Sequence, residues 1–76
     1  MLIRVRTSDY NTAYINSKKI QSIEIESIIP VDSDKTAYYI AFYLENRKYY
    51  NVERWFDQYE AEKALECTAE YIEGDE

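Results

Sequence analysis

Apolar and polar side chains alternate along most of the first two thirds of the chain, with the period of a β-strand that has one face in the core. Five stretches follow this pattern, and clusters of Ser, Asp, Asn and Thr separate most of them. The clearest stretch is Thr36–Leu44, where Ile40 and Phe42 fall on one face. Tyr39 and Tyr43 fall on the other. We therefore expect about five strands, joined mainly as antiparallel hairpins.

The fifth strand is expected over Lys48–Val52. Asn46 suits the positive φ of a tight turn before this strand, because Asn tolerates the left-handed region. Alternation along the strand turns Tyr50 and Val52 toward the core. Tyr49 is then expected on the opposite face, together with the tyrosines of the preceding strand.

The period changes to that of a helix after residue 56. Asp57, with Glu60 three residues later, resembles a capping box, and Gly74 suits the C-terminal end. Residues at helical spacing form a stripe that is expected to be buried: Ala61, Ala64, Leu65, Thr68, Tyr71 and Ile72. The opposite side carries four glutamates: Glu62, Glu66, Glu70 and Glu73.

These elements predict one α+β domain over residues 1–76. Residues 2–53 would form a small antiparallel β-meander, and residues 57–73 would form one C-terminal helix packed on one sheet face. The alternation does not decide which face the helix covers. If the helix covers the side of Ile40 and Phe42, the other side stays open.

Charge is distributed unevenly along the chain. Residues 57–76 hold eight acids and one lysine, whereas residues 1–56 hold seven acids and eight bases, and the net charge is −6. Acids four residues apart on a helix repel by about 0.2–0.5 kcal/mol per pair, and acids near its C-terminus oppose the helix dipole. We expect such a face either to serve a cationic partner or to be an ordinary solvated surface.

The residue types that are missing exclude several kinds of chemistry. The chain has no histidine, one glycine and one cysteine, Cys67. It therefore lacks a Ser-His-Asp triad, an imidazole metal site, a glycine-rich phosphate loop and an internal disulfide. We expect no enzyme activity, no cofactor and no metal. No apolar run approaches the roughly 20 residues that span a bilayer, so no membrane contact is expected. The single cysteine makes a reducing cytoplasm the expected compartment.

Nine tyrosines indicate an interaction surface on the open side of the sheet. Tyrosine offers a large contact area at small entropic cost and is enriched at interfaces. The trio Tyr39, Tyr43 and Tyr49 is therefore predicted to bind a partner or a second copy of the chain. Cross-strand pairing that only stiffens the sheet is the alternative. Direct binding of nucleic acid is not expected, because a chain with a net charge of −6 repels a polyanion.

Five segments carry a resemblance to a known family: Ile3–Val5, Tyr14–Asn16, Ile20–Glu24, Tyr43–Tyr49 and Glu60–Leu65. With these segments, residues 2–66 resemble the small flagellar-operon FlbD-type proteins and similar short proteins of phages and mobile elements. The resemblance implies this fold and an accessory role, with no catalytic residues to carry over. Two features depart from the family. Arg47 stands where a glycine usually follows the hairpin asparagine, and the tail is acidic rather than basic.

The leading hypothesis is a non-catalytic, acidic protein-binding module, specifically a phage or mobile-element inhibitor of the anti-defence type. Its helix would mimic nucleic acid and occupy a basic, nucleic-acid-binding groove of a host protein. The residues expected to make the contact are Glu62, Glu66, Glu70 and Glu73, with Tyr39, Tyr43 and Tyr49 as a second patch. The alternative is a structural or regulatory accessory protein that self-associates through its sheet as a homodimer.

Overall fold

The computed structural model describes residues 1–32 and 34–74 of the chain. Asp75 and Glu76, the last two of the eight acids in residues 57–76, lie outside these residues. Within them the chain forms, in order, β1 (Leu2–Arg6), β2 (Thr12–Asn16), the 3-10 turn η1 (Ser17–Lys19), β3 (Ser22–Ile28), β4 (Ala37–Tyr43), β5 (Lys48–Tyr50) and α1 (Gln58–Glu73). Strands therefore come first and the helix comes last, as the periodicity predicts.

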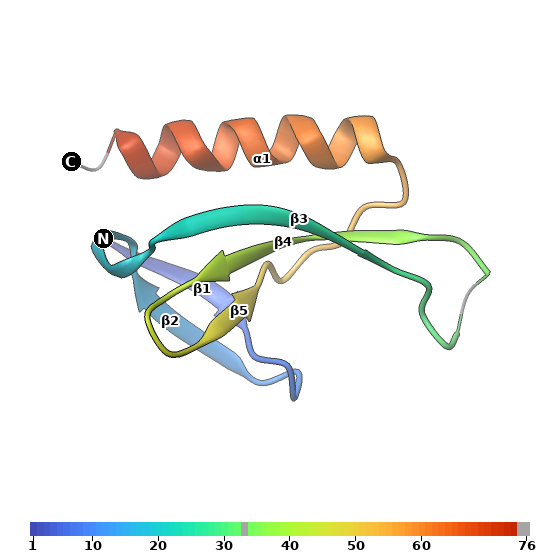
Figure 1. Cartoon of the computed structure of the whole chain (residues 1–76), viewed down its shortest axis with the longest axis horizontal. Coiled ribbons are helices and arrows are strands. Elements are labelled where there is room, and N and C mark those ends of the chain that lie inside the picture. Colours follow the sequence, from blue (N-terminus) through green and yellow to red (C-terminus); the bar gives the residue numbers. More distant parts are fainter. Residues whose placement is uncertain (33, 75–76) are drawn as a thin grey trace.

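The strands form one open sheet with the order β2-β1-β5-β4-β3, and all neighbouring strands are antiparallel. A hairpin of β1 and β2 and a meander of β3, β4 and β5 are joined where Arg6 pairs with Tyr50. The helix α1 runs along β3 and β4 and covers one face of this part of the sheet (Figure 1). The structure thus confirms a small antiparallel α+β fold with a C-terminal helix on one sheet face.

The helix covers the sheet face that carries Ile40 and Phe42. Both side chains are buried, and they form one cluster with Val5 and Ile15 of the first hairpin. Three apolar residues of α1 pack against this cluster: Ala64, Leu65 and Ile72. Isolated helices of about this length are marginal in water, so burial of the apolar stripe is what holds α1 in place. This contact also fixes the direction in which the outer side of the helix points.

The helix begins and ends where the sequence predicts. Asp57 is the N-cap, and its Oδ1 accepts a 2.9 Å hydrogen bond from the backbone N–H of Tyr59. Gly74 follows the last turn with a φ of −65°, so it ends the helix without using the left-handed region. The predicted buried stripe is wrong in one member. Tyr71 is 65% exposed, because the sheet lies on the side of the neighbouring Ile72.

The prediction of which β5 side chains point toward the core is also wrong. Tyr49 pairs with Phe42, so it turns into the core and is only 9% exposed. Tyr50 lies on the open face instead, and Val52 lies beyond the end of the strand, exposed to solvent. The turn sets this register, because four residues connect the paired ends of β4 and β5. A shift of one residue in the register moves every side chain of a strand to the other face.

Candidate functional site

The outer side of α1 carries a row of carboxylates, the acidic strip, formed by Glu62, Glu66, Glu70 and Glu73. All four side chains are exposed, and their spacing of four, four and three residues aligns them along one side of the helix. Within the part of the chain that the structure describes, no lysine or arginine forms an ion pair with any of them. Gln58 Nε2 donates a 3.4 Å hydrogen bond to Glu62 Oε1, but among the described residues no ion pair neutralises the charge of the acidic strip.

An exposed aromatic ring lies in the same row. Tyr59 precedes Glu62 by three residues, and its side chain is 63% exposed. The ammonium of Lys63 lies 5.1 Å from the centre of this ring, so Tyr59 rather than a carboxylate holds the cation of this helix. The charge pattern alone did not indicate Tyr59, although its i, i+3 spacing to Glu62 places it in the row.

On the sheet face that α1 does not cover, the carboxylate of Glu26 is bound by two neighbouring side chains. The Tyr43 hydroxyl donates a 2.6 Å hydrogen bond to Glu26 Oε2, and Lys48 Nζ lies 3.1 Å from the same oxygen. Burial by itself raises the pKa of Glu26, but the hydrogen bonds from Tyr43 and Lys48 and the charge of Lys48 outweigh it, so this pKa lies below its ordinary value. Contacts with Tyr50 and then with Glu26 raise the pKa of Lys48. Both charges are therefore already engaged within the protein.

Tyr39 lies on the open face as predicted, but its neighbours cover it and it is only 8% exposed. The guanidinium of Arg6 lies 5.1 Å from the centre of its ring, and Tyr50 packs against it edge to face at 6.2 Å. The predicted tyrosine trio does not form one exposed patch, because Tyr39 is covered, Tyr43 is hydrogen-bonded and Tyr49 is in the core. Tyr50, which the alternation placed in the core, takes the position expected for Tyr49.

The turn between β1 and β2 holds a tyrosine in an unusual backbone conformation. Tyr10 has a φ of 66°. No other non-glycine residue that the structure describes has a positive φ, so the positive φ predicted for Asn46 is wrong. A 3.0 Å hydrogen bond from the Tyr10 N–H to the Thr7 carbonyl closes the turn, together with one of 2.8 Å from the Thr7 N–H to the Asn11 carbonyl. The Arg6 guanidinium lies 4.7 Å from the centre of the Tyr10 ring. Glycine is favoured at such a position, so a tyrosine here indicates a role for its side chain.

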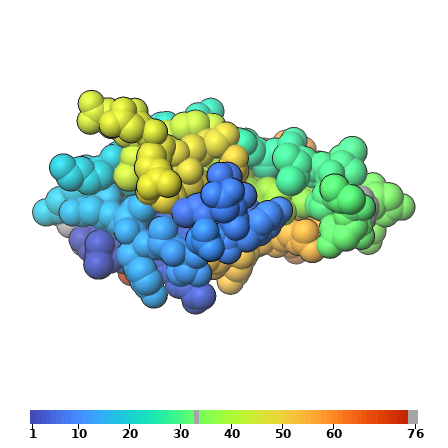
Figure 2. Space-filling view, turned by 90° about the horizontal axis from the view of Figure 1, so that it is seen from below, coloured from blue at the N-terminus to red at the C-terminus, as the bar shows by residue number. Residues whose placement is uncertain are grey.

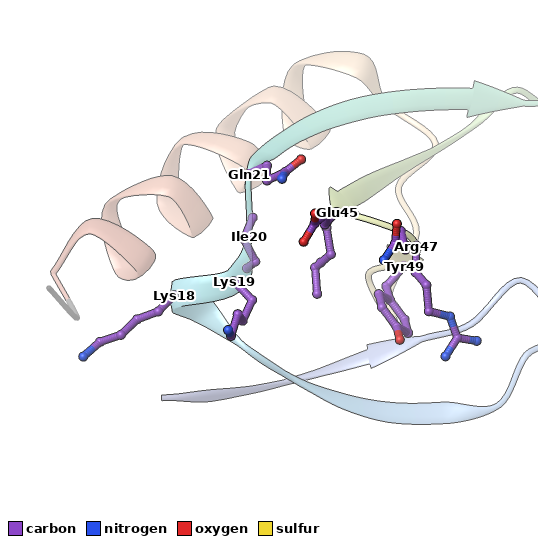
Figure 3. Close-up of a pocket in the computed structure, with 9 residues that line it drawn as sticks. Lys18, Lys19, Ile20, Gln21, Glu45, Arg47 and Tyr49 are labelled. Atoms are coloured by element: carbon purple, nitrogen blue, oxygen red, sulfur yellow. The ribbon is translucent and has the colours of Figure 1, made fainter.

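An open hollow of about 450 Å³ lies between η1 and the turn that joins β4 to β5 (Figure 3). Ile20, Leu44 and Tyr49 supply its apolar lining. Charges of both signs line it: Glu45 on the one hand, and Lys19 and Arg47 on the other (Figure 3).

The described residues offer little for other chemistry. They contain no group of three His, Cys, Asp or Glu side chains that could hold a metal ion. Cys67 is an exposed free thiol on α1. In the same residues, no helix has the length and apolar character that crossing a membrane requires.

No family model, curated protein or solved structure matches this chain. The resemblance to the FlbD-type proteins therefore stays a prediction from the sequence.

Proposed function

We propose that this chain is a non-catalytic protein-binding module that docks its acidic strip on a basic surface of a partner protein. The observation that carries the proposal is the row of four carboxylates without ion pairs, among the described residues, on the outer side of an ordered helix. Because the apolar stripe holds the helix on the sheet, the carboxylates have a fixed backbone spacing before a partner arrives. Such preorganisation lowers the entropic cost of binding.

The energetics of the helix support the same proposal. Glu66 lies four residues from both Glu62 and Glu70, and each like-charged pair costs about 0.2–0.5 kcal/mol on a helix surface. Glu73 stands in the last turn, which has no basic residue, so it opposes the negative end of the helix dipole. A charge pattern that lowers the stability of its own helix is expected where a cationic partner compensates it.

The proposed partner surface is a basic groove that otherwise binds nucleic acid. Carboxylates four residues apart lie about 6 Å apart along a helix axis, so the acidic strip presents a regular line of anions, as a phosphate backbone does. Tyr59 adds exposed aromatic area to this line, which favours a protein partner. The role that follows is that of a cytoplasmic inhibitor from a phage or mobile element, which blocks the groove by nucleic-acid mimicry.

Affinity capture tests the proposal. The tagged chain is incubated with a cell lysate at low ionic strength, and the retained proteins are identified by mass spectrometry. Proteins that bind nucleic acid are expected to be retained and to elute as the salt concentration rises. Added nucleic acid is expected to displace them, because it competes for the same basic groove.

Two charge-matched variants separate the acidic strip from the net charge. Glu66→Lys with Glu70→Lys reverses the middle of the strip, whereas Glu24→Lys with Glu45→Lys makes the same change of net charge at exposed positions elsewhere. The first variant is expected to lose the captured proteins and the second to keep them. Equal retention by both variants, or no displacement by nucleic acid, would contradict the proposal.

A self-associating accessory protein is the second candidate, favoured by the free edge of the sheet. The order of the strands leaves β2 at one edge, and two large side chains stand exposed at this end: Leu2 and Tyr14. An unpaired edge strand is a ready template for pairing with a second copy. Light scattering at several concentrations decides this case, since a salt-insensitive dimer favours it and a monomer at every concentration excludes it.

A further inference from the structure

Two adjoining hollows on the open face form one groove. They share Tyr10, Ile28 and Tyr39, and their volumes are about 160 Å³ and about 520 Å³. Arg6 and Glu26 line the smaller hollow, and Arg54 and Asp32 line the larger one. Seen from the side away from the helix, the β1–β2 turn (blue) stands between the β4–β5 turn (yellow) and the β3–β4 loop (green) (Figure 2). The groove therefore runs between the β1–β2 turn and the β3–β4 loop, which are far apart in the sequence.

Arg6 is a cation without a carboxylate partner among the described residues. Its guanidinium lies 4.7 to 5.2 Å from the centres of three rings, those of Tyr10, Tyr39 and Tyr50. Glu26 lines the same hollow, but it is already held by Tyr43 and Lys48. The three rings fix the guanidinium while leaving its charge uncompensated.

The second cation of the groove is only loosely paired. Arg54 lies 4.0 Å from Asp32, and their side chains are 40% and 72% exposed, so this pair contributes little. Arg54 also interacts with Tyr39, and this interaction raises the pKa of its guanidinium. Two guanidinium groups thus flank the same buried tyrosine.

The walls of the groove are apolar and exposed. Ile28, Ile29 and Val31 stand on one side, and all three are open to solvent. Tyr10 stands on the other side and is 75% exposed, although its backbone is in the left-handed region. That conformation costs about 1 kcal/mol or more for a residue with a Cβ, and glycine would avoid the cost. The large aromatic side chain of Tyr10 therefore stands at the rim of the groove although the backbone conformation there favours glycine.

We propose that this groove, lined by Arg6, Tyr10, Ile28–Val31, Tyr39 and Arg54, binds an extended acidic segment of a protein. Carboxylates of the segment pair with Arg6 and Arg54, because a guanidinium binds carboxylates through paired hydrogen bonds. Apolar side chains beside these carboxylates lie against Ile28–Val31 and the ring of Tyr10. The groove lies on the side of the sheet opposite the acidic strip, so this inference does not depend on the proposed function.

A protein segment fits this groove better than a single-stranded nucleic acid. Bases stack on free aromatic faces, whereas Tyr39 is covered and Arg6 already lies over the rings of the floor. The isoleucine and valine wall offers apolar contact without donors or acceptors for base edges. The net charge of −6 also opposes a polyanion more strongly than a short segment with one or two carboxylates.

A library of random linear peptides displayed on phage tests the proposal. The library is selected on the immobilised protein, and the enriched peptides are labelled with fluorescein for anisotropy titrations. Enriched peptides are expected to carry Asp or Glu next to apolar residues. Arg6→Gln is expected to weaken their binding about tenfold or more, because a hydrogen-bonded charge pair is lost. Arg4→Gln removes the same charge from the same strand outside the groove and is expected to leave binding within about twofold.

Tyr10→Gly separates binding from folding. Glycine adopts the backbone of this position at lower cost, so the melting temperature is expected to stay equal or rise, while peptide binding weakens. The proposal is overturned if no peptides are enriched, if the enriched peptides are basic, or if they bind the Arg6→Gln variant as tightly as the wild type. It is also overturned if a labelled oligouridine binds and displaces the peptides, since the groove would then be a nucleic-acid site.

Discussion

The Tyr43 hydroxyl donates a 2.6 Å hydrogen bond to Glu26, although the two residues are not partners across β3 and β4. Glu26 pairs with Tyr39, and Tyr43 lies four residues further along β4. The two side chains therefore reach toward each other past the small side chain of Ala41, which lies between them on the same face. Lys48 joins them from β5, 3.1 Å from Glu26. The contact ties three strands together on the face that no helix covers.

Loss of the Glu26 carboxylate is expected to change how stability depends on pH. The pKa of Glu26 is lower in the folded chain than its ordinary value of 4.5, so the folded state holds fewer protons than the unfolded state. Its contribution to stability is complete above the ordinary pKa and is lost as the pH falls through the lowered pKa of the folded state. Urea unfolding between about pH 3 and pH 7 measures this dependence.

The Glu26→Gln variant should therefore be less stable than the wild type near neutral pH, and the difference should shrink as the pH falls. Glu24→Gln removes a carboxylate from the same face of β3 that is hydrogen-bonded to neither Tyr43 nor Lys48, and it serves as the control. A constant difference between Glu26→Gln and the wild type at every pH would show that the carboxylate does not act through its charge.

The register of β5 predicts opposite sensitivities for two adjacent tyrosines. Tyr49→Ala leaves a cavity in the core and is expected to lower the free energy of unfolding by about 3 kcal/mol. Tyr50→Ala removes a half-buried ring from the open face and is expected to cost about 1 kcal/mol. A domain of this size is stable by roughly 4–11 kcal/mol, so urea unfolding resolves the two variants. The reverse order would mean that β5 is shifted by one residue.

Removal of the N-cap is expected to loosen the first turn of α1. Asp57→Ala deletes the acceptor of the 2.9 Å hydrogen bond from the Tyr59 N–H, which is expected to cost about 1 kcal/mol. Asp57→Asn is the matched control, since asparagine caps a helix about as well without the charge. Thermal unfolding followed by circular dichroism compares the three proteins. An equal loss in both variants would indicate that the charge of Asp57, rather than the cap, stabilises the helix.

Glu66→Lys is expected to stabilise the chain while it weakens the proposed docking. The substitution turns two repulsive pairs, with Glu62 and Glu70, into two attractive ones and should raise the free energy of unfolding by about 1 kcal/mol at low salt. Added salt should shrink this gain, because it screens exposed charges. Glu66→Gln, which only removes the repulsion, is expected to give about half of the gain. A loss of stability in Glu66→Lys would mean that Glu66 has a structural role.

The periodicity of the sequence was sufficient to predict the strands, the helix and one candidate surface, the acidic strip. Alternation predicted the strands, and the helix followed from Asp57, Gly74 and the spacing of its apolar residues. The acidic strip followed directly, because residues three and four apart on a helix share a side. Only the structure shows which sheet face the helix covers, since both faces of β4 are rich in apolar and aromatic residues.

The candidate groove could not be predicted from the sequence. It depends on Arg6 meeting Tyr39 and Tyr50, and these residues are separated by more than thirty positions along the chain. The pairing of β1 with β5 brings them together, and local patterns carry no information about which strands become neighbours. The positive φ of Tyr10 could not be predicted either, because a tyrosine rarely adopts the left-handed region of backbone conformation.

The sequence by itself determined where strands and helix lie and where the carboxylates of α1 gather, because these features depend only on the repeat of each element. The tertiary structure alone decided that Tyr49 is in the core, that Tyr50 lies on the open face and that Arg6 lies among three tyrosine rings. The physical reason is the register. One residue more or less in the turn before β5 would exchange the two tyrosines, and the free energy that selects between these arrangements comes from packing across the whole sheet.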